Sequence, residues 1–425
     1  MAKRKTKKDV SMLRSLSHGR ILSRSALKSN YLTRREGSIV PPGMKLTLFD
    51  KFRSSRVFAW FATWFDSAVS NIGPRHVFID PRSLPSKGIY EMDAVTRIAL
   101  AGDWGTGAYE SEAVAIAMQH AAPDFTLHIG DVYYTGSKKE ILQNCALKPG
   151  NNVVAWPRGS KGSFAMLGNH EMFNRGFAYF DTFLPNLGFA PNGIYPKEGQ
   201  QSSLFCLENE HWLVVGLDTG YNSVQWGTSF GLTEENIGWL QECIFTAEKK
   251  NKGVILFSHH QYFSRFEGDY KKTAEQLAAI NGFLGTREIL WIWGHEHRFS
   301  GYEISSEMLL KVHGRCIGHS GMPIDIKPPD TTKTGVPPLA FYDNRKNPYY
   351  TEPTGMNGYC LLDFTGNTLT LTYYDGWWIP KNNDFENGAP SSRKILTEIF
   401  HAQNGEVKLM SREKHIPDPD FNVFP

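Results

Sequence analysis

The chain has 425 residues, of which 41% are hydrophobic, so it is long and apolar enough to build one large domain with insertions and tails around a sizeable core. Its five cysteines are an odd number, lie far apart and form no CxxC pair, which argues against both a disulfide framework and a zinc–thiolate site and favours a reducing compartment. The formal net charge of +3 is distributed unevenly, because residues 1–35 carry eleven Lys and Arg against Asp9 alone, a net +10 that leaves −7 for the rest of the chain.

This basic segment, taken as residues 1–42, predicts a solvated, disordered tail; contact with nucleic acid or with an anionic membrane is the alternative. The tail lacks the apolar core of a signal peptide, which favours a cytoplasmic protein. Its Arg- and Ser-rich, acid-poor composition also fits an organelle transit segment. No protein partner can be predicted.

Residues 43–92 predict an apolar and aromatic extension that packs on the main domain. Within it, Val57–Phe65 reads VFAWFATWF and places aromatic residues at i,i+4 spacing, which predicts a helix. This run is too short to span a bilayer. An interfacial membrane helix is the alternative to packing on the domain.

From Val95 onward, short apolar runs predict buried strands, each followed by a small residue and then a polar one. The runs are Thr96–Ala101, Phe125–Ile129, Phe164–Leu167, Trp212–Leu217, Val254–Phe257 and Ile289–Trp293. Helix formers predict helices over Glu110–Ala121 and over Thr233–Lys249, the second with Thr233 as its N-cap. Alternating strands and helices indicate a layered α/β arrangement.

The later part of the chain is richer in strand-like segments. Residues 303–374 predict a second sheet, and the Pro-, Lys- and Thr-rich segment 323–353 predicts a long loop or insertion. We therefore expect one catalytic domain over residues 93–400, with its motifs in 102–297 and the second-sheet strands and insertion in 301–375. Residues 401–425 are expected to form a C-terminal tail.

Polar residues capable of chemistry stand at the carboxyl end of each predicted strand. The segments are GDWG (Asp103), GDVYY (Asp131, Tyr134), GNHE (Asn169, His170), SHHQ (His259, His260) and GHEH (His295, His297). Because ligands of open α/β sheets bind outside the carboxyl ends of strands, one fold brings these five loops together.

The donor atoms in these segments are carboxylate, amide and phenol oxygens and imidazole nitrogens, a set suited to iron, manganese or zinc. There are too many donors for one four-coordinate ion. A carboxylate such as Asp131 has two oxygens and can bridge two cations about 3.5–4 Å apart, so a dinuclear centre is predicted. The glycine before each donor is expected to let the backbone turn sharply at the sheet edge.

The five ordered segments resemble the motifs of the calcineurin-like metallophosphoesterase superfamily, most of all those of its purple acid phosphatase branch. The resemblance implies an α+β fold, a four-layer α/β/β/α sandwich of two mixed β-sheets with a dinuclear metal site at the C-terminal ends of the strands. It also implies that one metal is bound by Asp103, Asp131, Tyr134 and His297, and the other by Asp131, Asn169, His259 and His295. Iron paired with manganese, zinc or a second iron is expected if Tyr134 is a ligand, and manganese otherwise.

The same resemblance implies that His170 acts on the phosphate or on the leaving group, with a role in fixing the Asn169 loop as the alternative. His260 and His319 are candidate substrate contacts; His260 also fits a role in orienting its neighbour, and His319 fits a loop histidine with local hydrogen bonds. Asp218 in GLDTG is interpreted as a structural turn residue.

The expected function is metal-dependent hydrolysis of a phosphate ester by an activated water, with a phosphomonoester as the favoured substrate. A phosphodiesterase or nuclease acting on nucleotides or nucleic acid is the alternative, because monoesterases and diesterases share this centre. A non-catalytic scaffold that kept the fold is disfavoured, since every ligand position is filled.

Overall fold

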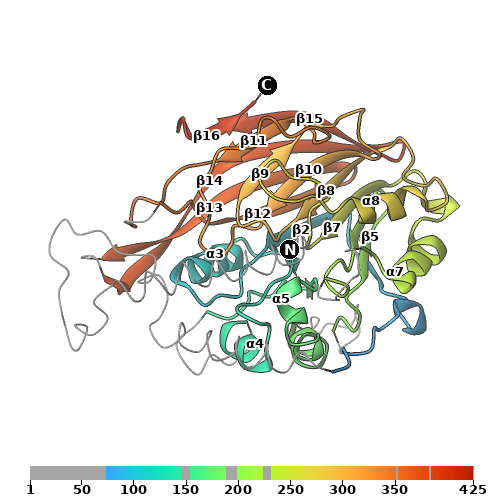
Figure 1. Cartoon of the computed structure of the whole chain (residues 1–425), viewed down its shortest axis with the longest axis horizontal. Helices are drawn as coiled ribbons and strands as arrows, with labels where there is room; N and C mark the ends of the chain where they lie inside the picture. The colour runs from blue at the N-terminus through green and yellow to red at the C-terminus, as the bar shows by residue number, and fades with distance from the viewer. Residues whose placement is uncertain are drawn as a thin grey trace, which may run out of the picture.

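Two β-sheets packed face to face form the centre of the computed structural model (Figure 1). The structure describes residues 73–145, 154–187, 199–223, 231–350, 353–381 and 384–424, without the side chains of residues 384–386. The basic tail of residues 1–42 and the apolar run Val57–Phe65 lie outside the described residues. In the described part of the chain, no helix is long and apolar enough to cross a membrane.

The first sheet has seven strands in the order β15-β14-β13-β12-β2-β3-β4. Strands β2, β3 and β4 are parallel, and the other neighbours are antiparallel, so the sheet is mixed. The strands are β2 (Val95–Ala101), β3 (Phe125–His128), β4 (Gly162–Ala165), β12 (Gly358–Thr365), β13 (Thr368–Lys381), β14 (Asp384–Gln403) and β15 (Glu406–Lys414).

The second sheet has nine strands in the order β1-β5-β6-β7-β8-β10-β9-β11-β16, and it is also mixed. Its central strands β6, β7, β8 and β10 are parallel. The strands are β1 (Ile89–Glu91), β5 (Phe205–Glu208), β6 (Trp212–Gly216), β7 (Gly253–Ser258), β8 (Glu288–Trp293), β9 (Phe299–Tyr302), β10 (Lys311–Ile317), β11 (Leu339–Asp343) and β16 (Phe421–Val423).

Period-two alternation in the strands explains why both faces of each sheet are covered. In β8, Leu290 and Ile292 point into the core between the sheets, whereas Trp291 and Trp293 point outward. The outward residues of β6, β7 and β8 pack against α7 (Glu234–Trp239) and α8 (Lys271–Ala278). Those of β2 and β12 pack against α3 (Tyr109–His120), so the four-layer α/β/β/α sandwich is confirmed.

Sequence order did not predict how the strands divide between the sheets. Strands β12 and β13 do not form a separate second sheet with their neighbours in sequence. They join the sheet of β2, β3 and β4 instead, whereas β9, β10 and β11 extend the sheet of β8. Strand β11 also lies inside segment 323–353, which had been expected to be a loop.

Two boundaries predicted from composition also differ. Residues 401–425 do not form a tail, because the end of β14, all of β15 and β16 belong to the sheets. The helix expected over Thr233–Lys249 is broken: α7 ends at Trp239, a π-helical segment continues over Leu240–Ile244, and a 3-10 turn covers Ala247–Lys249. Thr233 is its N-cap, as predicted.

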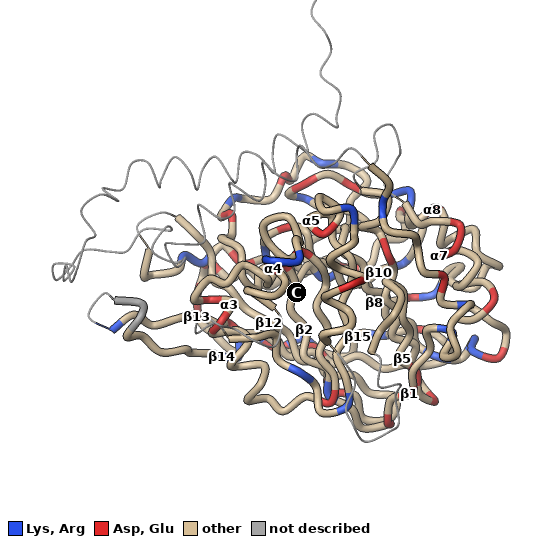
Figure 2. The backbone as a smooth tube through the Cα atoms, turned by 90° about the horizontal axis from the view of Figure 1, so that it is seen from below, with Lys and Arg blue, Asp and Glu red and all other residues tan. Residues whose placement is uncertain are grey.

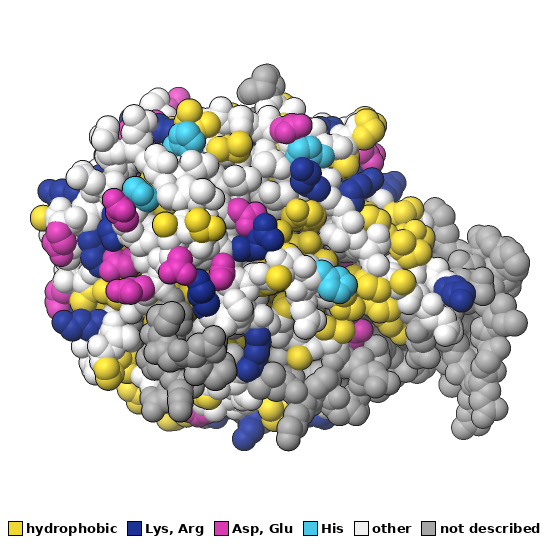
Figure 3. All heavy atoms as spheres, turned by 180° about the vertical axis from the view of Figure 1, so that it is seen from behind, with side chains coloured by type: hydrophobic (Ala, Val, Ile, Leu, Met, Phe, Trp, Pro, Cys, Tyr) yellow, Lys and Arg dark blue, Asp and Glu magenta, His cyan; other side chains and the backbone are white. Residues whose placement is uncertain are grey.

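The ends of β13 and β14 form a hairpin that projects beyond the body of the sandwich in both views (Figures 1 and 2). Residues 376–379 of β13 pair with residues 389–392 of β14 in this projection. On the opposite face from Figure 1, basic and acidic side chains are interspersed (Figure 3).

A buried ion pair joins the two sheets. Arg315 on β10 donates from its Nε and Nη2 atoms to the Glu398 carboxylate on β14, at 2.6 Å each. Tyr373 and Arg412 donate to the same carboxylate, at 2.7 and 2.9 Å. Both Arg315 and Glu398 are 0% exposed.

Candidate metal centre

The predicted donor residues follow strands of both sheets. Asp103 follows β2, Asp131 follows β3, and Asn169 begins α5 (Asn169–Met172) after β4 of the seven-stranded sheet. His259 follows β7, and the GHEH turn follows β8 of the nine-stranded sheet. Ligating atoms of Asp103, Asp131 and His259 lie within 4.8 Å of one another, and so do those of His259, His260 and His295. The candidate site therefore lies where the carboxyl edges of the two sheets meet.

Three donor residues have a left-handed backbone. The φ angles are 56° for Asp103, 67° for Asp131 and 66° for His295. This conformation is uncommon for residues other than glycine, and such strain often occurs at functional sites. The glycine before each donor is the expected site of the sharp turn, and Gly130 before Asp131 is indeed left-handed, with a φ of 94°. At Asp103 and His295 the donor itself takes up the turn instead.

The neighbouring glycines are needed mainly for space. A Cβ atom on Gly168 would lie 2.1 Å from Asp131 Oδ1, and one on Gly294 would lie 2.7 Å from Asp103 Oδ2. Both distances are shorter than any real contact of a Cβ atom, so a side chain at either position would push a candidate ligand away. The glycines thus allow the loops to approach the carboxylates closely.

Asp131, Asn169 and His259 form one half of the site. His259 Nε2 lies 3.3 Å from Asp131 Oδ1 and 3.1 Å from Asn169 Oδ1. The other ring nitrogen, Nδ1, lies 2.9 Å from the Ile129 carbonyl oxygen, which fixes the ring and directs Nε2 at the donors. This geometry supports the assignment of His259, rather than His260, to the position next to Asp131.

Asp103, His297 and a tyrosine form the other half, and here the structure corrects the prediction. The hydroxyl of Tyr133 donates to Asp103 Oδ1 at 2.9 Å and lies 3.3 Å from Asp131 Oδ2 and 2.7 Å from His297 Nε2. The predicted residue, Tyr134, instead packs its ring edge-on against His170 at 5.3 Å. Two adjacent tyrosines in one loop offer the same chemistry, so the sequence pattern could not decide which ring turns inward.

Electrostatics in this pocket depend on burial and on the two carboxylates. Burial raises the pKa of Tyr133 well above its usual value, and Asp103 and Asp131 raise it further. Burial alone would raise the pKa of Asp131, but His259 and His170 hold it well below its usual range. Asp131 therefore carries a negative charge.

His170 lies beside Asp131. Its Nδ1 atom lies 2.5 Å from the carbonyl oxygen of Tyr134, and its Nε2 atom lies 3.7 Å from Asp131 Oδ2. The backbone amide of His170 also donates to Asp131 Oδ1 at 2.9 Å. The hydrogen bond at Nδ1 fixes the ring so that Nε2 faces the donor cluster.

His260 and His295 are neighbours, with ring centroids 4.6 Å apart. Burial lowers the pKa of His295 to about 3 and that of His260 well below its usual value, so both imidazoles are neutral and can offer a lone pair. Thr219 Oγ1 lies 3.1 Å from His260 Nδ1. His260 therefore lies at the candidate site, next to a predicted ligand.

His319 does not lie at the donor cluster, contrary to the prediction of a substrate contact. Its ring stacks on Phe299, at 5.0 Å between centroids, and contacts the backbone at Gly358. Phe299 belongs to the core between the sheets, so His319 is directed into that core. The small residues around it in GHSGMP allow the chain to pass close to Gly102 rather than forming a substrate loop.

Asp218 is a turn residue, as interpreted. Its carboxylate accepts the amides of Gly220 and Tyr221 at 2.9 and 2.8 Å. Burial raises its pKa to about 6.

Two glutamates that the sequence analysis did not single out hold the donor loops. Glu171 accepts the backbone amides of Asp131, Val132 and Gly168 at 3.2, 2.7 and 2.9 Å. Glu140 accepts the amides of Tyr134, Thr135 and Ser137 at 2.5, 3.0 and 3.0 Å. The S-x-x-E spacing of Ser137 and Glu140 is a capping-box signal that could have identified Glu140.

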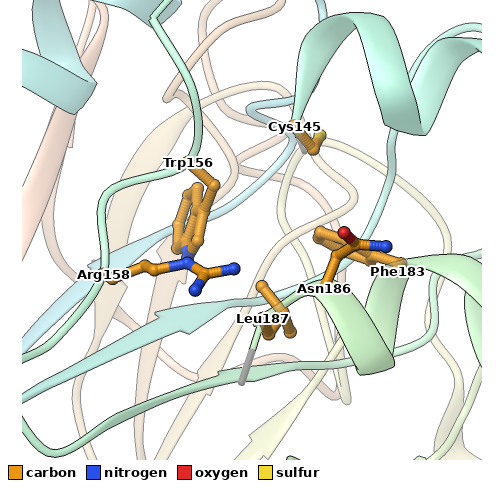
Figure 4. Close-up of a pocket in the computed structure, with 6 residues that line it drawn as sticks. All are labelled: Cys145, Trp156, Arg158, Phe183, Asn186 and Leu187. Atoms are coloured by element: carbon orange, nitrogen blue, oxygen red, sulfur yellow. The ribbon is translucent and has the colours of Figure 1, made fainter. Parts of the chain in front are cut away.

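A small cavity lies apart from the donors; its volume of about 10 Å³ is enough for about one water molecule (Figure 4). Its lining residues are Cys145, Trp156, Arg158, Phe183, Asn186 and Leu187. Burial raises the pKa of the Cys145 thiol well above its usual value, so this cysteine is protonated and is no nucleophile.

The residues present fit a metal centre. Asp103 and Asp131 are 0% and 1% exposed, and such closely spaced buried carboxylates repel each other unless a cation offsets their charge. Oxygen donors and imidazole nitrogens around them match iron, manganese or zinc. Two overlapping groups of donors share His259, which agrees with more than one cation.

Comparisons with known proteins agree with this fold. The model of the family described as calcineurin-like phosphoesterase matches residues 96–299, which include every donor segment, so this part of the chain is similar to that family. A search of curated proteins finds no match.

Solved structures resemble the chain at low sequence identity. A structure of PhoD aligns with a TM-score of 0.50 and 10% identity, covering 75% of this chain and 72% of PhoD. The purple acid phosphatase PPD1 from yellow lupin (Lupinus luteus) seeds aligns with a TM-score of 0.45 and 14% identity, covering 71% of this chain and 54% of PPD1. At such identity, the PhoD alignment supports the fold.

Proposed function

We propose that this protein is a metal-dependent hydrolase that cleaves phosphomonoesters. The observation that carries this proposal is the convergence of carboxylate, amide and imidazole donors from both sheets around the buried carboxylate of Asp131. The match of residues 96–299 to the calcineurin-like phosphoesterase family supports hydrolysis of phosphate esters. The preference for monoesters rests on the resemblance of the motifs to the purple acid phosphatase branch.

In this proposal Asp103, Asp131, Tyr133 and His297 hold one metal ion, and Asp131, Asn169, His259 and His295 hold the other. Tyr133 replaces Tyr134 because its hydroxyl lies against both carboxylates. Metal ions of the iron, manganese or zinc class bound there would supply Lewis acidity and lower the pKa of a water molecule.

His170 acts on the substrate from the side of Asp131. The hydrogen bond between its Nδ1 atom and the Tyr134 carbonyl orients the ring and leaves Nε2 free to face a phosphate. A protonated Nε2 would donate to a phosphate oxygen or to the leaving oxygen. His260 borders the same space next to His295 and is a second candidate for a phosphate contact.

The test compares hydrolysis of an aryl phosphate monoester with that of the matching diester, using wild-type protein supplied with manganese or iron. We expect a rate ratio well above one. A ratio well below one would redirect the search to nucleotides and nucleic acids and would give the basic tail a function. A protein that binds metal but hydrolyses neither ester would contradict the proposal and would favour a binding scaffold.

The control is Asn169→Ala, which removes one donor and leaves the protonatable groups in place. We expect a loss of at least about 100-fold in turnover, because a ligand should matter more than the groups that merely orient ligands.

Asp131→Asn should lose both metals as well as activity. A variant at Asp131 that retains two bound metals would contradict the bridging role of this residue.

A further inference from the structure

The loop of residues 264–270 carries a phenol to the edge of the donor cluster. The hydroxyl of Tyr270 lies 3.4 Å from His295 Nε2, and its ring centroid lies 4.9 Å from that of His260. Tyr270 is half-buried. None of the five sequence motifs includes this residue.

The inner side of this loop is held by the GHEHR turn itself. Glu296, between the two candidate ligand histidines, accepts a hydrogen bond from Ser264 Oγ and one from Trp293 Nε1. Ser264 Oγ in turn accepts the amides of Phe266 and Glu267, each at 2.9 Å. The same turn therefore carries two candidate ligands and anchors the loop that ends at Tyr270.

A second contact also holds the inner side of this loop. The Arg298 guanidinium lies 3.8 Å above the ring of Phe266, close enough for a cation–π interaction. Arg298 and Glu296 are both buried, at 3% and 2% exposed. Their contacts fix the start of the loop relative to His295 and His297.

The outer side of the loop is held by the segment that the sequence marked as an insertion. Lys333 Nζ donates to the carbonyl oxygens of Ser264 and Glu267 at 2.6 and 2.9 Å, and to Asp269 Oδ1 at 2.6 Å. Arg265 donates in the opposite direction to the carbonyl oxygens of four residues of the insertion: Asp330, Lys333, Val336 and Pro337. These charge-assisted bonds lock the two loops together.

We propose that Tyr270 positions the phosphate ester at the candidate metal centre by donating its hydroxyl to a phosphate oxygen, and that Glu296 and Lys333 act through the loop to set its place. A phenol is a hydrogen-bond donor suited to a charged oxygen. The ring of Tyr270 lies edge-on to that of His295, at 5.9 Å between centroids, and next to that of His260, at 4.9 Å. This inference rests on the proposed phosphate-ester function.

The first test uses Tyr270→Phe, which removes only the hydroxyl. Binding of inorganic phosphate to metal-loaded protein is measured by calorimetry, together with metal content, KM and kcat for an aryl phosphate. We expect unchanged metal content and about tenfold weaker phosphate binding, the loss for one hydrogen bond to a charged group. Tyr374→Phe is the matched control, because Tyr374 is also half-buried but stacks on Tyr359 away from the donors. Equal phosphate affinity in wild type and Tyr270→Phe overturns the inference.

The second test concerns the hydrogen bonds between Lys333 and the loop of residues 264–270. Lys333→Met keeps the length of the side chain but removes the ammonium group, so we expect several-fold weaker phosphate binding with unchanged metal content. In the double variant Tyr270→Phe/Lys333→Met, we expect no loss beyond that of Tyr270→Phe, because Lys333 acts through the same hydroxyl. Fully additive losses would overturn the positioning role of Lys333.

The calorimetric readout separates this inference from the proposed function. If wild type binds phosphate through Tyr270 but hydrolyses neither ester, the proposed function fails and the positioning role stands. If wild type hydrolyses the monoester and Tyr270→Phe matches it in phosphate affinity, KM and kcat, the inference alone fails.

Discussion

Tyr133 and Tyr134 are adjacent and chemically identical, yet the hydroxyl of Tyr133 lies against both buried carboxylates and His297, whereas the ring of Tyr134 packs edge-on against His170. In protein loaded with ferric iron, a coordinating phenolate gives a visible charge-transfer absorption. We therefore expect this absorption in wild type and in Tyr134→Phe, and its loss in Tyr133→Phe, as measured by visible spectroscopy at equal iron content. Loss of the band in Tyr134→Phe alone would show that Tyr134 is the ligand, as the motif spacing predicted.

At the scale of residues, the sequence identified which types of residue lie together at the candidate site, but not always which residue of that type contributes the atom. Asp131, Asn169 and His259 could be placed together because each follows a strand of recognisable apolar pattern. Tyr133 and Tyr270 could not be placed at the site from the sequence. The position of the Tyr133 hydroxyl depends on the direction of its ring within one loop, and the position of Tyr270 depends on contacts between loops far apart in the sequence. His319 carries the right chemistry, but its packing on Phe299 removes it from the site.

At the scale of elements, local patterns predicted individual strands and caps better than their partners. Strand β8 and the cap at Thr233 follow directly from apolar alternation and from side-chain hydrogen bonding at a helix start. The pairing of β12 with β2 does not follow from any local pattern, because the two strands lie more than 250 residues apart in the sequence and no local signal specifies their pairing. The tail predicted at 401–425 was wrong for two different reasons. Strand β15 pairs with its sequence neighbour β14 through the Asn404–Gly405 turn, a local hairpin signal that the prediction did not use, whereas β16 pairs with the distant strand β11.

Two N-caps offer a matched test of how an element supports the site. Ser137 caps α4 (Lys138–Asn144) in the loop that carries Asp131, whereas Thr233 caps α7, which packs on the outer face of the other sheet. Ser137→Ala and Thr233→Ala should each lower the free energy of unfolding by about 1 kcal/mol. Only Ser137→Ala should also weaken metal binding, because Ser137 donates to Glu140, which holds the Tyr134 and Thr135 amides.

Denaturant unfolding and metal titration of the two variants measure these effects. Equal metal affinity in both would show that the capping box supports stability alone. A weaker affinity in Thr233→Ala would indicate that the centre responds to general loss of stability rather than to its own loop.

At the scale of the whole molecule, the site depends on keeping the two sheets in register, because each contributes part of the donor set. The Arg315–Glu398 pair crosses the interface between them at 2.6 Å. Burial alone would raise the pKa of Glu398, but Arg315 and Arg412 outweigh it and lower the pKa to about 2. In the unfolded chain the group returns to its ordinary value near 4.5.

This difference predicts how stability changes with pH. A depressed folded pKa stabilises the fold above the unfolded value, by about 3 kcal/mol, and the contribution is lost as the pH falls from about 4.5 to about 2. Glu398→Gln leaves Arg315 buried and without its partner charge, so at neutral pH we expect a loss of about 3–5 kcal/mol in the free energy of unfolding. The gap between wild type and this variant should narrow as the pH falls through that window.

The double variant Arg315→Met/Glu398→Leu tests whether stability requires the ion pair itself or requires only that neither charge is buried without its partner. Buried ion pairs replaced by apolar residues of similar volume are often neutral or more stable, whereas removal of one partner is costly. We therefore expect the double variant to recover most of the stability lost in Glu398→Gln, also because Arg412 keeps an ion pair with Glu303 at 2.7 Å. Urea unfolding at neutral pH measures the recovery. A double variant as unstable as Glu398→Gln would show that the charges themselves hold the sheets, and with them the two halves of the metal centre, together.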